Sequence, residues 1–334
     1  RYESFEINKP KLITLLNHDY VIWKDKQGNL SALDNICPHA GANLAKGSHI
    51  VEYQEKSCLA CPYHGNKVQF LGDGKVIVDG NISTKEIQPV LPLQVVNGLV
   101  WTYGLNWEEQ NGKLISQSIE PKLPIPDYKN INFLPEYNPQ LNLSELNHIY
   151  SFSESFNGNI DQLMWNAHDG EHFAGTHYDS MLTKDIKIEN LTQDENKISW
   201  QIFLHKRDDK QVNKNKMNPL VNDVVIQCIN SFLPSLLILT NEIAKGKLFV
   251  GIAYSYPESP TKTKFCLDGY LNFKYAWWHK LLKFPQKGNN FRDTLLFEDL
   301  TILNNLYPTF NKKIALKNDT PAELAMNYLK NWNY

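Results

Sequence analysis

The chain has 334 residues, enough for two domains of ordinary size with separate hydrophobic cores. A formal net charge of −2 removes the electrostatic basis for binding nucleic acid or an acidic membrane surface. The longest apolar run, residues 232–240, is too short to span a bilayer and contains Pro234. Five cysteines are few and odd in number, and no signal peptide is visible, so we expect a cytoplasmic protein without a disulfide framework.

The first part of the chain, up to about residue 115, consists of short apolar runs separated by turn residues. Asp73-Gly74 predicts a hairpin turn, and Asn97-Gly98 in the centre of residues 93–103 suits a type I′ turn. Other strands are expected at residues 20–23 and 30–33. This pattern predicts an all-β module.

Two short motifs with metal-ligand character lie within this module. They are Cys37-Pro38-His39 and Cys61-Pro62-Tyr63-His64, and a glycine follows each histidine closely. A [2Fe–2S] centre of Rieske type needs two thiolates for one iron and two imidazoles for the other. The motifs therefore predict such a cluster, held by the ligands Cys37, His39, Cys61 and His64.

Zinc is the competing interpretation of these motifs. Cys58 and Cys61 also form a C-x-x-C pair, and zinc accepts mixed cysteine and histidine ligands. Either interpretation leaves one of the five candidate ligands unused, and for the cluster that residue is Cys58. Cys228 and Cys266 lie in apolar, strand-like runs and are expected to be inert core residues.

The strings CPHAGANLAKG and CPYHG resemble the Rieske domain of ring-hydroxylating and related Rieske non-heme iron oxygenases. The spacing of the ligands matches in both motifs. Ala40 and Asn66 stand where this family often has Arg and Trp. Those two positions bear on the docking surface for the electron donor and leave the cluster ligands untouched.

Prolines accumulate between about residues 116 and 140, which is typical of an extended, semi-rigid connection. We therefore expect a Rieske domain over residues 1–120 and a catalytic domain over residues 121–334. In the second domain, residues 197–204 alternate apolar and polar side chains, as a half-buried strand does. Further strands are expected at residues 223–232, 235–241, 247–256 and 264–273, and a C-terminal helix from Thr320 to about Trp332. The expected fold class is α+β, with a mainly antiparallel sheet and helices of the helix-grip type in the second domain.

A second candidate metal site lies in residues 154–177, which contain His168, His172 and His177. On a regular helix His168 and His172 share a face, and they form an H-x-x-E-H string like that of inverted zinc peptidases. Alternatively, Gly175 ends the helix and lets His172 and His177 converge. The residues alone leave both pairings open.

Asp169-x-x-His172-x-x-x-x-His177 is similar to the D-x-x-H-x-x-x-x-H string of the catalytic domain of Rieske oxygenases. This resemblance implies that His172 and His177 bind a mononuclear iron. It also implies that Asp169 links an iron ligand to a Rieske histidine of a neighbouring subunit. Asn166 and His168 are candidates for contacting the ligand residues, and the alternative for His168 is a satisfied polar residue of the core.

The third iron ligand is expected from the stretch 291–308, which reads as a helix ended by Pro308. Projected on this helix, Asp299 lies within the apolar stripe and Glu298 to the side. A buried carboxylate is costly unless it is paired or binds metal, so Asp299 is the better candidate. The family pattern E-D-x-x-I agrees with it, and the alternative is an ion pair between Asp299 and Arg292.

The resemblance implies the oxygenase component of a homotrimer that uses Fe(II) and dioxygen to hydroxylate or oxidatively demethylate a small organic substrate. Single-oxygen chemistry is favoured over dihydroxylation. No flavin or dinucleotide fingerprint is evident, so NAD(P)H is expected to act through a separate ferredoxin or flavin reductase. The alternative is a Rieske electron-transfer or regulatory protein with an inactive second domain.

Overall fold

The computed structural model of the protein describes residues 1–111, 113–119, 125–126, 145–177, 183–195, 197–206, 224–232, 235–244, 246–274, 291–306, 314 and 316–330. The chain divides into two compact units, Arg1–Tyr128 and Lys129–Tyr334. The boundary expected near residue 120 and most of the proline-rich connection lie outside the described residues.

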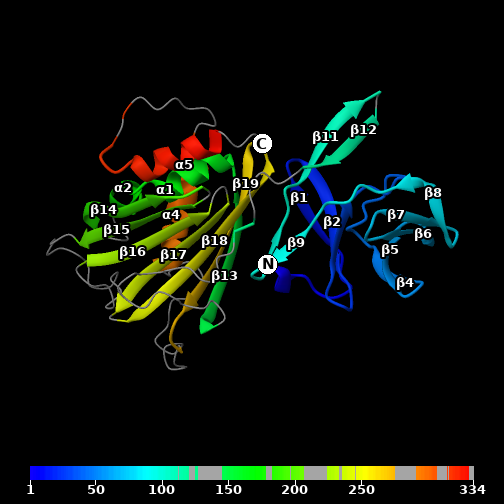
Figure 1. Ribbon diagram of the computed structural model, residues 1–334, viewed down its shortest axis with the longest axis horizontal. Helices are drawn as coiled ribbons and strands as arrows, with labels where there is room; N and C mark the ends of the chain where they lie inside the picture. The colour runs from blue at the N-terminus through cyan, green and yellow to red at the C-terminus, as the bar shows by residue number, and fades with distance from the viewer. Residues whose placement is uncertain are drawn as a thin grey trace. The chain divides into compact units, whose positions relative to one another are not determined.

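The first unit is built from short antiparallel strands (Figure 1). β1, β2 and β3 form one sheet, β4 to β8 form a five-stranded sheet in chain order, and β9–β10 and β11–β12 are two-stranded. The strands are β1 Lys11–Leu15, β2 His18–Lys24, β3 Leu30–Asp34, β4 His49–Tyr53, β5 Lys56–Cys61, β6 Gly65–Leu71, β7 Lys75–Val78, β8 Asn81–Ile87, β9 Gln94–Val96, β10 Leu99–Trp101, β11 Leu105–Gln110 and β12 Lys113–Ser118. A short 3-10 helix, Tyr2–Ser4, precedes them.

The turn between β9 and β10 has the conformation that its sequence predicts. Asn97 and Gly98 have φ values of 52° and 78°, the left-handed region that a type I′ turn requires at both positions. Val96 and Leu99 pair across the turn. The hairpin prediction is confirmed.

The main core of the first unit lies directly beneath the two ligand loops. Trp23, Leu33, Leu44, Leu59 and Phe70 are at most 1% exposed and belong to one cluster. The same cluster contains two of the cysteines singled out above. The metal motifs are therefore anchored in a close-packed core cluster of this unit.

The second unit is a seven-stranded antiparallel sheet with helices on one face (Figure 1). The strand order is β13-β19-β18-β17-β16-β15-β14. The strands are β13 Asn147–Phe156, β14 Thr183–Gln193, β15 Lys197–Lys206, β16 Val224–Phe232, β17 Leu236–Ala244, β18 Lys247–Ser259 and β19 Lys262–Leu271. The helices are α1 Ile160–His168, α2 His172–Gly175, α4 Phe291–Leu303 and α5 Thr320–Lys330.

The core of the second unit lies between this sheet and its helices. On β15 the alternate residues Ile198, Trp200, Ile202 and Leu204 are at most 3% exposed, which confirms the predicted strand. They pack with apolar residues of α1 and α5, among them Ile160, Leu163, Ala325 and Leu329. α1 contacts α5 and α4, and α2 contacts β14.

These elements confirm the α+β fold class, with some differences from the expected elements. β13 and β14 were not predicted as strands. The helix expected over residues 291–308 is observed as Phe291–Leu303, and Pro308 lies outside the described residues. In the part of the chain that the structure describes, every helix falls short of the length and hydrophobicity that a bilayer crossing requires.

Two glycines of the first unit provide a matched test of this packing. Gly74 has φ +85°, and a Cβ there would lie 2.4 Å from the carbonyl oxygen of Gln88. Gly80 has φ +82°, but nothing lies within 4 Å of its added Cβ. Gly80→Ala is expected to cost about 1 kcal/mol, the cost of the left-handed conformation alone. Gly74→Ala adds a backbone clash and is expected to lower the thermal midpoint at least twice as far. Equal midpoints of the two variants would contradict this packing.

Candidate metal centres

The four predicted cluster ligands meet at the tips of two loops. One loop follows β3, and the other joins β5 to β6. The Sγ atoms of Cys37 and Cys61 are 3.5 Å apart. The Nδ1 atoms of His39 and His64 are 3.2 Å apart, with ring centroids at 4.4 Å. The structure thus pairs thiol with thiol and imidazole with imidazole.

Backbone hydrogen bonds hold the first loop in shape. The N–H of Cys37 donates to Ala42 O at 2.9 Å, and the N–H of Gly41 donates to Cys37 O at 2.8 Å. Gly41 has φ +72°, the left-handed conformation that closes this tight turn. The Gln88 amide donates to Asp34 O at 2.7 Å and to Ile36 O at 2.9 Å. A side chain some fifty positions along the chain therefore fixes the approach to the first cysteine.

The chemistry of these four residues fits a Rieske cluster. Cys37 and Cys61 are 1% and 0% exposed, whereas His39 is exposed. Burial raises the pKa of the Cys37 thiol, so the thiolate needs a cationic partner here. A cluster whose inner iron binds the thiolates and whose outer iron binds the imidazoles meets that need.

A single zinc ion fits this region less well. Cys58 is fully buried in a separate small cluster with Leu71 and Ile77, and its thiol lies 3.6 Å from Lys56 O. Burial raises the pKa of Cys58 to about 11. Within the described residues, the one group that brings three ligand atoms within 4.8 Å of one another lies in the other unit. All five cysteines are free thiols in this structure.

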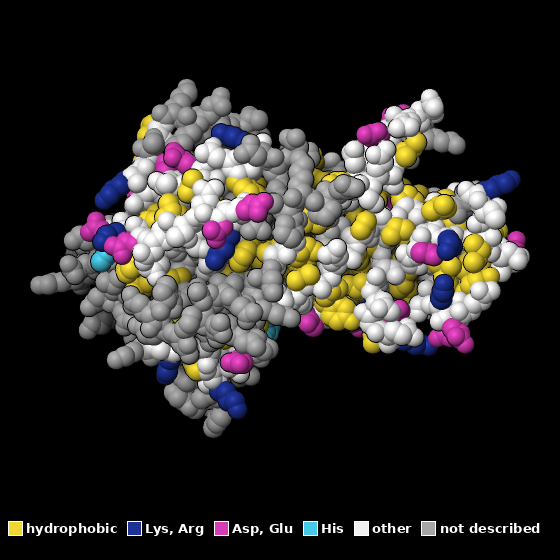
Figure 2. All heavy atoms as spheres, viewed as in Figure 1, with side chains coloured by type: hydrophobic (Ala, Val, Ile, Leu, Met, Phe, Trp, Pro, Cys, Tyr) yellow, Lys and Arg dark blue, Asp and Glu magenta, His cyan; other side chains and the backbone are white. Residues whose placement is uncertain are grey.

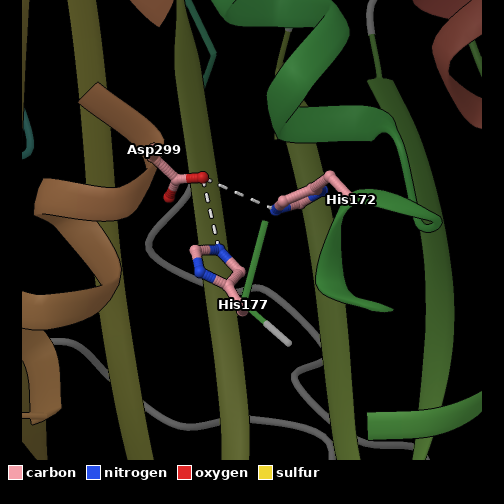
Figure 3. A group of neighbouring side chains, drawn as sticks. All are labelled: His172, His177 and Asp299. Atoms are coloured by element: carbon pink, nitrogen blue, oxygen red, sulfur yellow. Dashed lines mark ion pairs between the residues drawn. The ribbon is translucent and has the colours of Figure 1, made fainter. Parts of the chain in front are cut away.

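That three-ligand group is His172, His177 and Asp299 (Figure 3). Asp299 Oδ1 lies 3.9 Å from His172 Nε2 and 3.2 Å from His177 Nε2. The histidines come from α2 and the residues just after it, and the aspartate comes from α4, more than 120 positions later. Two imidazoles and one carboxylate are the donor set of a mononuclear non-heme iron.

The other nitrogen of each imidazole also has a partner. The Nδ1–H of His177 donates to Glu298 Oε2 at 2.9 Å, and the Nδ1–H of His172 donates to the carbonyl oxygen of Asp169. Hydrogen bonds of this kind fix the tautomer and direct Nε2 toward a metal. The side-chain amide of Asn166 lies 3.4 Å from Asp299 Oδ1 and donates to it.

The two histidines differ in their electrostatic surroundings. Burial lowers the pKa of His172, and the charge of Asp299 opposes this only in part. Burial also acts to lower the pKa of His177, but Asp299 and Glu298 outweigh it and raise that pKa above its ordinary value. Burial raises the pKa of Asp169, although His172 and nearby backbone N–H groups oppose it.

His168 is separated from this group by a break in the helix. α1 ends at His168, and Asp169 has an extended backbone with ψ 107°. Gly170 follows, and an added Cβ there would lie 3.1 Å from Ile188 Cδ1 and 3.3 Å from Ile202 Cδ1. The prediction of one regular helix with His168 and His172 on the same face is therefore wrong. The chain bends where it touches the sheet, and a short second helix then ends at Gly175.

His168 is a core residue in this structure. It is 1% exposed, its Nδ1–H donates to Met164 O at 2.6 Å, and its ring lies against Trp200 with centroids 5.1 Å apart. The glutamate of the H-x-x-E-H string, Glu171, accepts a hydrogen bond from Asn318 at 2.6 Å. The peptidase-like string therefore does not form a site.

The acidic residues near the two histidines make contacts that differ in part from those expected. Asp169 lies beside His172, but its carbonyl oxygen makes the contact with the ring, while its carboxylate accepts from the N–H of Glu171 at 2.9 Å. The helical projection placed Glu298 near a polar edge of the helix. In the structure its carboxylate contacts His177. The side chain of Arg292, the alternative partner of Asp299, lies outside what the structure describes.

Comparisons with known proteins agree with this picture. The Rieske [2Fe-2S] domain family matches residues 2–88. Cholesterol 7-desaturase nvd 1 of Ciona intestinalis is 32% identical over 133 residues, 39% of this chain and 25% of that protein. The 5,5'-dehydrodivanillate O-demethylase oxygenase subunit of Sphingobium sp. is 28% identical over 107 residues, 30% of this chain and 24% of that protein. The chain thus spans about a quarter of the length of these relatives.

Solved structures extend the likeness to both units. Apo dicamba monooxygenase superposes with a TM-score of 0.65 at 15% identity, covering 99% of this chain and 93% of that chain. Pseudomonas putida CBB5 NdmA with caffeine gives a TM-score of 0.62 at 16% identity, covering 97% of this chain and 83% of that chain. At this level of identity the likeness concerns the fold.

The first unit is therefore a Rieske [2Fe–2S] domain, and the second unit shares the fold of the solved monooxygenase structure. Residues 2–88 of the chain belong to the Rieske [2Fe-2S] domain family.

The ligand set of the first unit can be tested with two cysteine variants. Cys61→Ala removes a proposed thiolate and is expected to abolish the visible absorption of the cluster. Cys58→Ala removes an equally buried thiol of a different core cluster and is expected to retain it, at a stability cost of about 1–2 kcal/mol. Loss of the absorption in Cys58→Ala, with retention in Cys61→Ala, would contradict the assignment.

The buried His168 predicts an acid-sensitive fold. Burial lowers its pKa to about 4 from 6.5, so the unfolded chain binds the proton first as the pH falls. Stability is complete above pH 6.5 and is lost as the pH falls toward 4, by about 2 kcal/mol between pH 7 and pH 5. His168→Gln is expected to lower stability at pH 7 yet flatten this dependence, as measured by thermal midpoints at the two pH values. The exposed His49→Gln is the control, and identical pH slopes in wild type and His168→Gln would contradict the prediction.

Proposed function

We propose that this protein is the oxygenase component of a Rieske-type system that hydroxylates or oxidatively demethylates a small organic substrate. One observation carries the proposal: two histidines and an aspartate converge in the second unit of a chain whose first unit is a Rieske domain. A Rieske electron carrier with an inactive second domain has no need of such a group.

In this proposal His172, His177 and Asp299 hold a ferrous iron, each through one atom. Three protein ligands leave coordination positions open, as non-heme iron oxygenases require. When bound, the cluster supplies electrons singly and the iron activates dioxygen. The residues around them orient the imidazoles: Glu298 and the Asp169 carbonyl each accept a hydrogen bond from a ring N–H.

Electrons are proposed to come from a separate NAD(P)H-linked reductase, a ferredoxin or both. The resemblance described above implies a ring-shaped homotrimer in which Asp169 links His172 to a Rieske histidine of a neighbouring subunit. Exposed apolar residues near the cluster loops suit such a contact, since Tyr63 is 71% and Ile36 57% exposed. Hydrophobic side chains are visible across the surface of the first unit in Figure 2.

Single-oxygen chemistry is the proposed reaction class. The relatives named above include an O-demethylase oxygenase subunit, and the structural neighbours include a monooxygenase. We therefore propose a monooxygenase-type reaction in preference to dihydroxylation.

The proposal is tested by counting iron and measuring turnover in the same preparations. Wild type is expected to bind about three irons per chain, two in the cluster and one in the second unit. Asp299→Ala is expected to bind about two and to consume no oxygen with substrate. Asp169→Asn is expected to retain about three irons yet lose at least 100-fold in turnover with a surrogate reductase, because it disturbs the link and not the ligands.

Glu298→Gln is the matched control for Asp299→Ala, since it changes the neighbouring carboxylate but keeps an acceptor for His177. It is expected to retain most of the mononuclear iron. Two irons per chain in wild type would overturn the oxygenase proposal in favour of an electron carrier. Full turnover by Asp169→Asn would overturn the role of that residue alone.

A further inference from the structure

Two amide side chains lie side by side in the middle of the large sheet. Gln227 on β16 and Asn241 on β17 are directly paired across the two strands. Gln227 is in turn paired with Ile202 of β15, whose side chain belongs to the core beneath the helices. Because partners across a sheet point to the same face, both amides lie on the face that the helices cover.

These amides do not satisfy each other. Gln227 is 6% exposed. Asn241 Oδ1 is buried, and none of the residues that the structure describes offers it a hydrogen-bond partner. Side chains in this arrangement have Cβ atoms only about 5 Å apart, so a mutual hydrogen bond is within reach. A buried amide left unpaired costs free energy that a bound donor group would recover.

The loop that carries the proposed iron ligands lies over the same row of paired sheet residues that contains the two amides. Gly170, two residues before His172, lies over Ile188 and Ile202, which are paired in this row. Adjacent strands are about 4.8 Å apart, so Gln227 and Asn241 lie about 5 and 10 Å further along the sheet. In Figure 3 the strands of this sheet run behind the three ligands. This separation suits a small organic molecule that extends from the amides toward the ligands.

The sheet residues around the amides are apolar and uncharged. Their row continues with Phe249 and Leu271, and the row beside it contains Trp200, Ile229, Leu239, Gly251 and Gly269. No side chain in these two rows carries a charge. Leu239 and Phe249 keep part of their surface accessible although they lie on the helix-covered face. Anionic recognition normally uses Arg or Lys, which these rows do not supply.

We propose that Asn241, with Gln227 beside it, recognises a hydroxyl or N–H group of an otherwise apolar, uncharged substrate. The proposal rests on the proposed oxygenase function, because it names the substrate class of that same site. The Asn241 carbonyl accepts a hydrogen bond from the substrate, and the apolar rows contact its hydrocarbon part. The two amides are positioning residues, since they orient the substrate without touching the reacting oxygen.

The test measures binding of three matched probes to the anaerobic enzyme with both metal centres loaded. The probes are 2-naphthol, 2-methylnaphthalene and 2-naphthoate, which share a ring system and differ in one group, measured by equilibrium dialysis. Wild type is expected to bind 2-naphthol about tenfold more tightly than 2-methylnaphthalene, and 2-naphthoate the most weakly. In Asn241→Leu the ratio of the first two is expected to fall to near one.

Thr240→Val is the matched control. Thr240 is the adjacent residue on the same strand and faces the opposite side of the sheet. Its buried hydroxyl also has no hydrogen-bond partner among the described parts of the chain. This variant is expected to keep the wild-type ratio. The thermal midpoint gives a second readout: Asn241→Leu is expected to equal or exceed wild type, because an unsatisfied amide is removed.

Three results would overturn the inference: an unchanged probe ratio in Asn241→Leu, tightest binding of 2-naphthoate, or no binding of any probe to fully loaded enzyme. A large loss of stability in Asn241→Leu would show that the amide stabilises the fold, and it would also overturn the inference. The iron count separates this failure from that of the proposed function. Enzyme that holds its mononuclear iron but ignores the amide substitution remains an oxygenase candidate with a different recognition group.

Discussion

The second unit depends on one shared oxygen atom, Asp299 Oδ1, which two imidazole nitrogens face at 3.2 and 3.9 Å. Bringing a carboxylate and two imidazoles together in a buried site costs free energy unless their charges are balanced. The carboxylate supplies negative charge, and the outward nitrogens of both rings donate to oxygen acceptors. The result is a set of donor atoms held ready for a divalent cation, with the tautomers already determined. Helix α4, helix α2 and the bend before α2 all contribute to the position of this one atom relative to the rings.

The bend itself follows from packing rather than from local propensity. Asp169 leaves the helical region, and Gly170 approaches the sheet so closely that a Cβ would press on Ile188 and Ile202. A regular helix would have brought His168 to the metal and left His177 facing away. The sheet therefore selects which histidines become candidate ligands. His168 is directed instead into the core, where burial keeps it neutral.

Much of this could be predicted from sequence, because the ligand motifs are short and local. Cys37 and His39, or Cys61 and His64, are neighbours in the chain, so loop chemistry alone brings each pair together. Asn97-Gly98 determines its turn in the same local way. Asp299 could be predicted from a helical projection, since an acid within an apolar stripe requires a partner.

What could not be predicted depends on contacts between distant segments. The pairing of β13 with β19 joins positions more than 100 apart, and serines in β13 dilute its apolar alternation. The bend at Gly170 requires knowledge of the sheet beneath it. The side-by-side placement of Gln227 and Asn241 depends on strand register, which no single strand encodes. The contact of Glu298 with His177 likewise depends on where α4 docks.

The tether from Gln88 to the first cluster loop has a consequence for biosynthesis. Its amide holds the carbonyls of Asp34 and Ile36, and the neighbouring backbone of Pro89 and Leu91 bonds to β3. A nascent chain that has emerged only as far as His64 already carries every proposed cysteine and histidine ligand. It does not yet include Gln88, whose hydrogen bonds shape the first loop. The backbone contacts that shape the first cluster loop are therefore complete only after Gln88, which lies beyond β8, has also left the ribosome.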